Sequence, residues 1–168
     1  MPSQTRAAVG PAVGEPAPAF ALPTGDGRML RLAELRGRQV VLYFYPKDDT
    51  PGCTKEACGF RDALARFTNA NAVVLGISCD DPASHRRFAD KFHLPFPLLS
   101  DADGTVCRAY GVYKRKSMFG HSYWGIERTT FVLDEQGRIA HVFPKVSVNG
   151  HPEAVFQVLK PAPAARGR

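Results

Sequence analysis

Two cysteines, Cys53 and Cys58, stand in a stretch whose residue types suit thiol chemistry. The apolar run 40–45 predicts a strand, and Pro51 marks the start of a helix. Cys53 therefore falls where a strand is followed by a helix. The first N–H groups of a helix lack intrahelical partners and carry the positive end of its dipole, so a thiol there ionises more readily. Since the thiolate is the nucleophilic form, Cys53 is our candidate nucleophile.

The spacing of these two cysteines restricts how they react with each other. If both lie on one α-helix, a rise of ~1.5 Å and a turn of ~100° per residue put their Cα atoms roughly 9 Å apart. A disulfide needs Cα atoms within about 7 Å of each other. Cys53 and Cys58 can therefore be bridged only if the helix between them unwinds, which implies a conformational switch.

The pattern Pro46-x-x-x-Thr50-x-x-Cys53, with Cys58 after it, resembles the active site of peroxiredoxins of the bacterioferritin comigratory protein, or Q-type, subfamily. The resemblance covers residues 14 to about 160, and its further segments are 14–20, 84–85, 94–101, 110–112 and 128–134. It implies an α/β protein with the thioredoxin fold and an N-terminal extension, and an AhpC/TSA-like thiol peroxidase that uses no cofactor.

The resemblance also implies a role for each residue of the pattern. Cys53 attacks a peroxide oxygen and becomes a sulfenic acid, and Cys58 resolves it as an intramolecular disulfide. Thr50 hydrogen-bonds the thiolate and the peroxide, and Pro46, which on sequence grounds alone only ends a strand, shields the sulfur from water. Thioredoxin then returns the disulfide to the dithiol by thiol–disulfide exchange.

Arg128, one residue before a β-branched run, resembles the arginine of the family's active site. A permanently charged guanidinium can stabilise a thiolate and bind peroxide oxygens. Without the resemblance, an arginine at a strand edge is most often a solvated surface residue. We expect Glu56, three residues after Cys53, to orient Arg128 or to support the first helical turn electrostatically.

Each of these assignments has a structural alternative. Cys53 could simply pack as a small hydrophobic residue at a helix start, and the Thr50 hydroxyl could serve only as a helix cap. Cys58 could be a packed helix cysteine, in which case peroxidase chemistry at Cys53 would use an external thiol. Cys79 and Cys107 match no position of the family pattern. We expect them to be structural, while a second disulfide under strong oxidation remains open.

Length and composition bound the class of protein. The 168 residues, 44% hydrophobic and 23% charged, suit one globular domain. Four cysteines are too few for a disulfide framework, and no Cys-x-x-Cys or His-x-x-x-His spacing suggests a metal. No signal peptide and no apolar run near the ~20 residues of a membrane span is evident, so we expect a cytoplasmic protein without a membrane partner. By analogy with the family, we expect a monomer.

The formal charge of +6 comes from small basic groups, which favours a solvated surface over a nucleic-acid partner. One group, 114–116, is a candidate for steering an acidic reductase. Residues 114–124 show no period and predict a loop, whose apolar members could line a substrate entrance or a partner surface: Met118, Phe119, Tyr123 and Trp124.

The other patterns predict alternating strands and helices. We expect a disordered lead-in at 1–13, one domain at 14–160 and a flexible tail at 161–168. Expected strands and hairpins lie at 20–32, 40–45, 73–77, 129–133 and 139–143, and 94–99 leads through two prolines into a short strand. Expected helices lie at 33–36, 53–69, 82–92 and 152–159, and 101–104 opens a helix of one to two turns that includes Val106 and Tyr110. This order describes a mixed central sheet flanked by helices on both faces.

Two other functions remain open on the sequence alone. A thioredoxin-like disulfide reductase would use the same fold, although such proteins normally present Cys-x-x-Cys. A peroxide-sensing relay protein would use the same cysteines without high turnover and pass its oxidation to a partner. For a peroxidase, hydrogen peroxide and alkyl hydroperoxides are both candidate substrates.

Overall fold

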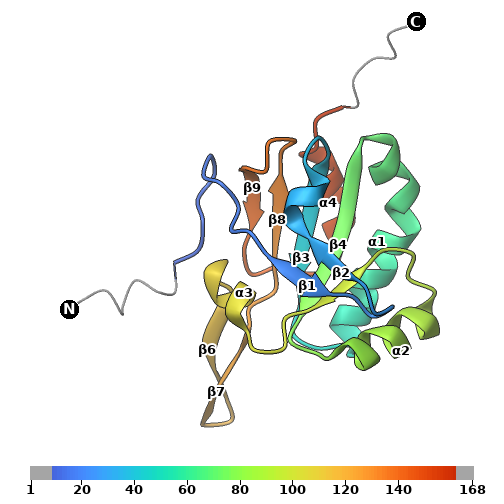
Figure 1. Ribbon diagram of the computed structural model, residues 1–168. Coiled ribbons are helices and arrows are strands. Elements are labelled where there is room, and N and C mark those ends of the chain that lie inside the picture. Colours follow the sequence, from blue (N-terminus) through green and yellow to red (C-terminus); the bar gives the residue numbers. More distant parts are fainter. Residues whose placement is uncertain (1–8, 162–168) are drawn as a thin grey trace, which may run out of the picture.

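The computed structural model describes residues 9–161, and its centre is a five-stranded mixed sheet (Figure 1). In sheet order the strands are β5 (Leu98–Ser100), β4 (Ala72–Ser78), β3 (Gln39–Phe44), β8 (Thr129–Leu133) and β9 (Ile139–Phe143). β3 is parallel to β4 and antiparallel to β8. The predicted mixed sheet, its central strand and the hairpin of β8 and β9 are confirmed.

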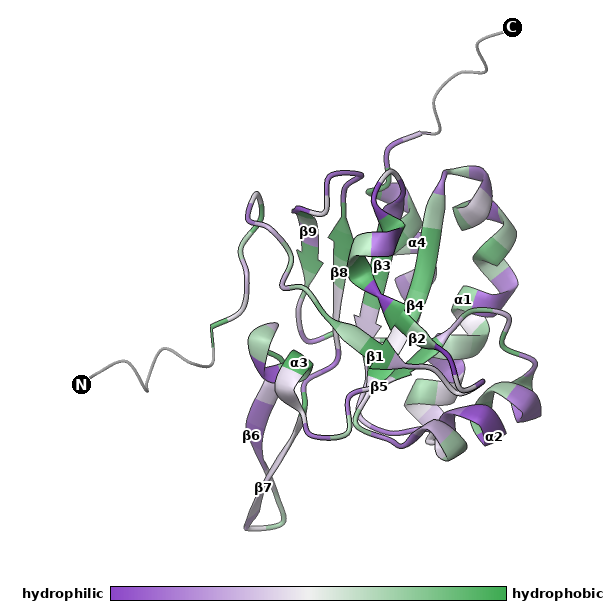
Figure 2. Cartoon of the chain, viewed as in Figure 1, coloured by the Kyte–Doolittle hydropathy of each residue, from purple (hydrophilic) through white to green (hydrophobic). Residues whose placement is uncertain are grey.

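Every residue of β3 is buried, because both faces of the sheet are covered. Val40, Leu42 and Phe44 belong to the core cluster on one face, and Val41 and Tyr43 belong to the cluster on the other. This arrangement explains why the strand is a continuous apolar run in the sequence, and Figure 2 shows the central strands as the most hydrophobic part of the chain.

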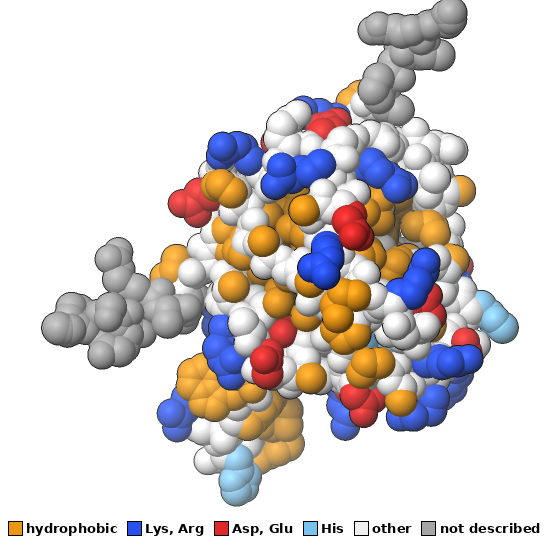
Figure 3. Space-filling model, viewed as in Figure 1, with side chains coloured by type: hydrophobic (Ala, Val, Ile, Leu, Met, Phe, Trp, Pro, Cys, Tyr) orange, Lys and Arg blue, Asp and Glu red, His pale blue; other side chains and the backbone are white. Residues whose placement is uncertain are grey.

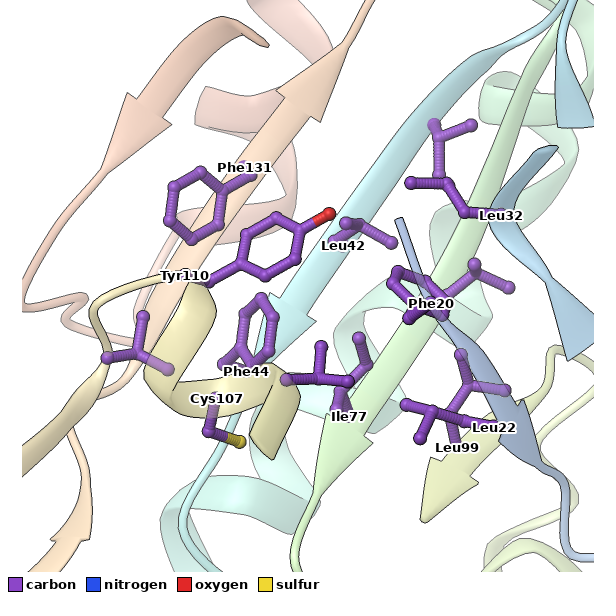
Figure 4. Close-up of a cluster of buried hydrophobic side chains, with 14 of the residues drawn as sticks. Phe20, Leu22, Leu32, Leu42, Phe44, Ile77, Leu99, Cys107, Tyr110 and Phe131 are labelled. Atoms are coloured by element: carbon purple, nitrogen blue, oxygen red, sulfur yellow. The ribbon is translucent and has the colours of Figure 1, made fainter. Parts of the chain in front are cut away.

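One face of the sheet is covered by the hairpin of β1 (Ala21–Pro23) and β2 (Met29–Arg31), a 3₁₀ turn at Leu32–Leu35, and the short helix α3 (Thr105–Ala109). Figure 4 shows this cluster, in which Leu22 of β1, Leu32 of the 3₁₀ turn and Cys107 of α3 lie over side chains of β3 and β8. The expected N-terminal hairpin and the two short helical segments are therefore confirmed.

The other face is covered by α1 (Pro51–Asn69), α2 (Pro82–Phe92) and α4 (His151–Gln157). α1 ends where we expected it to end. Asp81 caps α2 as predicted, since its side chain accepts a hydrogen bond from the Ser84 N–H at 2.8 Å. α4 ends two residues before the expected boundary, because the N–H groups of the next two residues bond to carbonyls only three residues back and tighten the last turn.

Residues 114–124, which we expected to be a loop, form a hairpin of β6 (Tyr113–Met118) and β7 (His121–Ile126) that projects from the body in Figure 1. Its two turn residues, Phe119 and Gly120, have φ of 52° and 81°, as a tight hairpin turn requires. The prediction was wrong because most side chains on both faces of the hairpin are exposed or half-buried, so the sequence shows no alternation.

The expected lead-in at 1–13 and tail at 161–168 lie largely outside the described residues, so that division of the chain stays a prediction. Within 9–161, none of the helices has both the length and the apolar character needed to cross a membrane.

Candidate active site

Cys53 lies in the first turn of α1, as predicted from the helix start. Thr50 is the N-cap residue and Pro51 takes the first helical position, where its missing N–H costs nothing. The intrahelical bonds begin with the Thr54 N–H, which donates to the Thr50 carbonyl. The preceding N–H groups, including that of Cys53, therefore have no acceptor within the helix. Only 1% of the Cys53 surface is exposed.

Arg128 reaches Cys53 because of the register of the central strands. β8 runs antiparallel to β3, with Thr129 opposite Phe44. Arg128, just before β8, therefore lies beside the end of β3, from which the chain continues to α1. Its Nη1 lies 3.3 Å from the Cys53 Sγ and donates to Glu56 Oε1 at 2.7 Å.

Gly52 leaves space for this guanidinium. A Cβ atom at that position would lie 3.1 Å from Arg128 Nη2, which is tighter than nine in ten real Cβ contacts. A larger residue at position 52 would therefore require the guanidinium to shift by a few tenths of an ångström.

Glu56 is a fully buried carboxyl group that pairs with Arg128. Burial raises the pKa of Glu56 to about 7, although Arg128 acts in the opposite direction. Burial by itself lowers the pKa of Arg128, but the nearby Glu56 and Cys53 outweigh it, so the pKa of the guanidinium is raised. Near neutral pH, Glu56 thus exchanges a proton while a permanent positive charge stays beside the Cys53 sulfur.

Thr50 and Pro46 lie in the loop that joins β3 to α1. The Thr50 hydroxyl donates to the Lys47 carbonyl at 2.9 Å, so its hydrogen points back into the loop instead of toward Cys53. Its oxygen lone pairs remain as acceptors. Pro46 is exposed at the end of the strand. Their roles toward thiolate and peroxide stay predictions.

Asp48 anchors this loop, a function that our sequence analysis missed. Its buried carboxylate accepts hydrogen bonds from the Tyr45 hydroxyl at 2.6 Å and the Ser84 hydroxyl at 2.8 Å, and lies 2.7 Å from His85 Nδ1. Its N–H donates to Asp80. The loop is thereby tied to the first turn of α2. The available signal was an acidic loop residue together with a Ser-His pair at a helix start.

The same groups are one of two clusters in the described chain whose ligand atoms could converge on a metal ion. Asp48, Asp80 and His85 offer atoms within 4.8 Å of one another. Each is already engaged within the protein, since His85 Nε2 lies 2.9 Å from the Leu99 carbonyl and Asp80 accepts from the Ser78 hydroxyl. The cluster therefore serves as a hydrogen-bond network that holds the loop.

Cys58 also lies in α1, is half-buried, and is not bonded to Cys53. Both cysteines are thus on one continuous helix, so the turn between them must unwind before a disulfide can join them. The base of the β6–β7 hairpin adjoins the same site, since Ile126 stands two residues before Arg128 and its carbonyl accepts a hydrogen bond from Lys116 Nζ at 2.5 Å. Burial lowers the pKa of Lys116, and the charge of Arg128 lowers it further.

Comparisons with known proteins agree with this geometry. The AhpC/TSA family model matches residues 13–142. A relative from Coxiella burnetii is 60% identical over 139 residues, covering 83% of this chain and 92% of the relative. Peroxiredoxin Bcp of Escherichia coli strain K12 is 46% identical over 147 residues, covering 88% and 94% of the two chains. The solved structure of Xanthomonas campestris bacterioferritin comigratory protein is 42% identical, with a TM-score of 0.79 over 82% of this chain and 88% of that one.

Proposed function

This chain belongs to the AhpC/TSA family, and we propose that it is a thiol peroxidase in which Cys53 reacts with the peroxide. The observation that supports this role most strongly is the 3.3 Å approach of Arg128 Nη1 to the Cys53 sulfur at the start of α1. A fixed cation and the helix N-terminus both favour the anionic form of the sulfur, which is the attacking species.

In the first step, the Cys53 thiolate attacks one oxygen of the peroxide and becomes a sulfenic acid. The other oxygen leaves as hydroxide or alkoxide and takes up a proton to give water or an alcohol. Its developing negative charge needs fixed donors nearby. Arg128 is the candidate donor, because its guanidinium touches the sulfur and is held in place by Glu56.

In the second step, we assign Cys58 as the thiol that attacks the sulfenic acid and releases water. Both cysteines lie within α1, so the turn between them must unwind before the sulfurs meet. Cys53 is almost fully enclosed, which disfavours direct attack by a protein thiol from outside. We therefore place an intramolecular Cys53–Cys58 disulfide before any encounter with the reductant.

For the third step, we propose thioredoxin or a similar dithiol protein, which reduces the disulfide by thiol–disulfide exchange. The basic group 114–116 lies on β6, next to the active site, where an acidic partner would be attracted. The cycle suits the cytoplasm, where such dithiols keep cysteines reduced. By analogy with the family, we propose that the enzyme is a monomer.

We propose hydrogen peroxide and alkyl hydroperoxides as substrates. The Xanthomonas campestris relative is described by its alkyl peroxide reduction activity. The nearly enclosed Cys53 sulfur admits a peroxide oxygen more readily than a bulky group.

The test is peroxide consumption coupled to thioredoxin and its reductase, together with non-reducing peptide mapping after one equivalent of hydrogen peroxide. We expect steady turnover and a linkage between the peptides that carry Cys53 and Cys58. With Cys58→Ser, one oxidation equivalent should still be consumed, but turnover with thioredoxin should stop. Rapid oxidation with poor turnover in the unaltered chain would instead identify a peroxide sensor, and a missing Cys53–Cys58 linkage would refute the role of Cys58.

A further inference from the structure

The two remaining cysteines come together in the fold. Cys79 directly follows β4, and Cys107 lies in α3. Their sulfurs and a carboxylate oxygen of Asp101 lie within 4.8 Å of one another. Both thiols are free, and both adjoin the core cluster that Figure 4 shows, in which Cys107 is labelled on α3.

Asp101 is already committed to the backbone of α3, which argues against a metal at this place. Its Oδ2 accepts from the Cys107 N–H at 2.7 Å, and its Oδ1 accepts from the Val106 N–H at 3.2 Å. The carboxylate therefore holds the start of α3 against the end of β5. The Cys79 and Cys107 thiols are then the groups of this cluster that take no part in the proposed peroxidase cycle.

These two thiols are unequal. The hydrogen bond between them lowers the pKa of the Cys79 thiol, although burial acts in the opposite direction. The same hydrogen bond raises the pKa of the Cys107 thiol, and burial raises that pKa further. Cys79 is half-buried, whereas Cys107 has no exposed surface. Cys79 is thus the thiol that a small oxidant can reach, and Cys107 is the adjacent thiol that keeps its proton.

We propose that Cys79 and Cys107 are a second peroxide-oxidisable pair that forms an intramolecular disulfide between the end of β4 and α3. The Cys79 thiolate attacks a peroxide oxygen, gives a sulfenic acid, and releases water or an alcohol after proton uptake. The Cys107 sulfur then attacks the Cys79 sulfur, the S–O bond breaks, and the hydroxyl leaves as water with the Cys107 proton. The peroxide is reduced by two electrons, and the two thiols supply them.

The geometry makes the second step easy. Sulfurs within 4.8 Å need to close only to the ~2 Å of an S–S bond, which side-chain rotation and small shifts of a short helix can supply. No helix has to unwind, unlike for Cys53 and Cys58.

The test uses the full-length Cys53→Ser/Cys58→Ser variant, which lacks the proposed catalytic pair and makes the result independent of the proposed function. It is treated with increasing hydrogen peroxide, alkylated under denaturing conditions, and digested with trypsin without reduction. Cleavage after lysine and arginine separates Cys79, in peptide 67–86, from Cys107, in peptide 92–108. We expect these two peptides linked within one molecule and lighter by two hydrogen atoms than their sum.

The matched control adds Cys107→Ser, after which oxidation should stop at a Cys79 sulfenic acid that a dimedone reagent captures. Full alkylation of both cysteines after prolonged treatment with a large excess of hydrogen peroxide would overturn the proposal, and so would a linkage only between molecules. If the variant does not fold, the same digest of the unaltered chain decides the question, because its Cys53 and Cys58 fall in the separate peptides 48–55 and 56–61.

Discussion

The two cysteine pairs of this molecule have opposite arrangements. In the first pair, Cys53 lies 3.3 Å from a guanidinium nitrogen, but Cys58 is about 1.4 helical turns away on the same helix. In the second pair, Cys79 and Cys107 have their sulfurs within 4.8 Å, and the charged group that lies equally close to them is the carboxylate of Asp101.

This difference separates two requirements of thiol oxidation. A nearby positive charge makes a cysteine a fast nucleophile, whereas a nearby second sulfur makes disulfide closure easy. In the function that we propose, the first pair reacts fast with peroxide and closes only after the helix between the two cysteines unwinds. We expect the second pair to react slowly with peroxide and then to close rapidly.

The largest effect should come from Cys53→Ser. This change removes the attacking sulfur, so peroxidase activity should fall by at least ~10³-fold, to the slow consumption that the second pair supports. Stopped-flow measurement of peroxide consumption checks this, with Cys107→Ser as the control that keeps near-normal activity. Equal losses in the two variants would erase the distinction between the pairs.

Arg128→Met should have the next largest effect. The methionine keeps much of the side-chain length but removes the charge and the donors, so the rate constant of Cys53 with hydrogen peroxide should fall by about 10²–10³-fold. Arg115→Met, on the exposed side of the hairpin, is the matched control and should leave that rate unchanged. A normal rate in Arg128→Met would show that the helix start alone activates the sulfur.

Glu56→Gln should change how stability depends on pH. A glutamate in the unfolded chain loses its proton near pH 4.5, whereas Glu56 in the fold loses it at about 7. Rising pH therefore favours the unfolded chain across that window, and the shift corresponds to roughly 3 kcal/mol.

The free energy of unfolding of the unaltered chain, minus that of Glu56→Gln, should fall by this amount as the pH rises from below 4.5 to above 7. The difference is the useful quantity, because burial lowers the pKa of His151 to about 4 and so gives both proteins the opposite slope between pH 4 and 6.5. Denaturant unfolding at a series of pH values provides the measurement, and parallel curves for the two proteins would contradict it.

The smallest effect should come from Lys55→Gly, between the two cysteines of α1. Glycine destabilises a helix by about 1 kcal/mol relative to alanine, which corresponds to a roughly 5-fold larger unwound population. Formation of the Cys53–Cys58 disulfide from the sulfenic acid should therefore be up to about 5-fold faster than in Lys55→Ala. Lys55→Ala is the right reference because both variants lose the contact of Lys55 with Asn149.

Rapid mixing with peroxide, followed by thiol trapping, measures this closure. The Cys79–Cys107 disulfide should form at the same rate in both variants. Equal closure rates for Cys53–Cys58 would mean that unwinding of α1 does not limit the first pair.

Much of this framework was predictable from local patterns. The continuous apolar run of β3, the proline before Cys53 and the Asp81 cap of α2 each report on residues that are neighbours in the chain. The β6–β7 hairpin was not predicted because most of its side chains are exposed or half-buried. A strand that buries neither face shows no alternation of apolar and polar residues. For Arg128, the residues alone suggested only a surface position, and the family resemblance was needed to place it at the site.

Local sequence patterns were thus sufficient to place Cys53 at a helix start and Cys58 on the same helix, because helix starts and helical spacing depend on a few consecutive residues. The packing of the sheet settled the rest. Pairing of β8 with β3 carries Arg128 to Cys53, and packing of α3 against the sheet carries Cys107 to Cys79. Such contacts join residues far apart in the chain, and no short segment encodes the order of strands that brings them together.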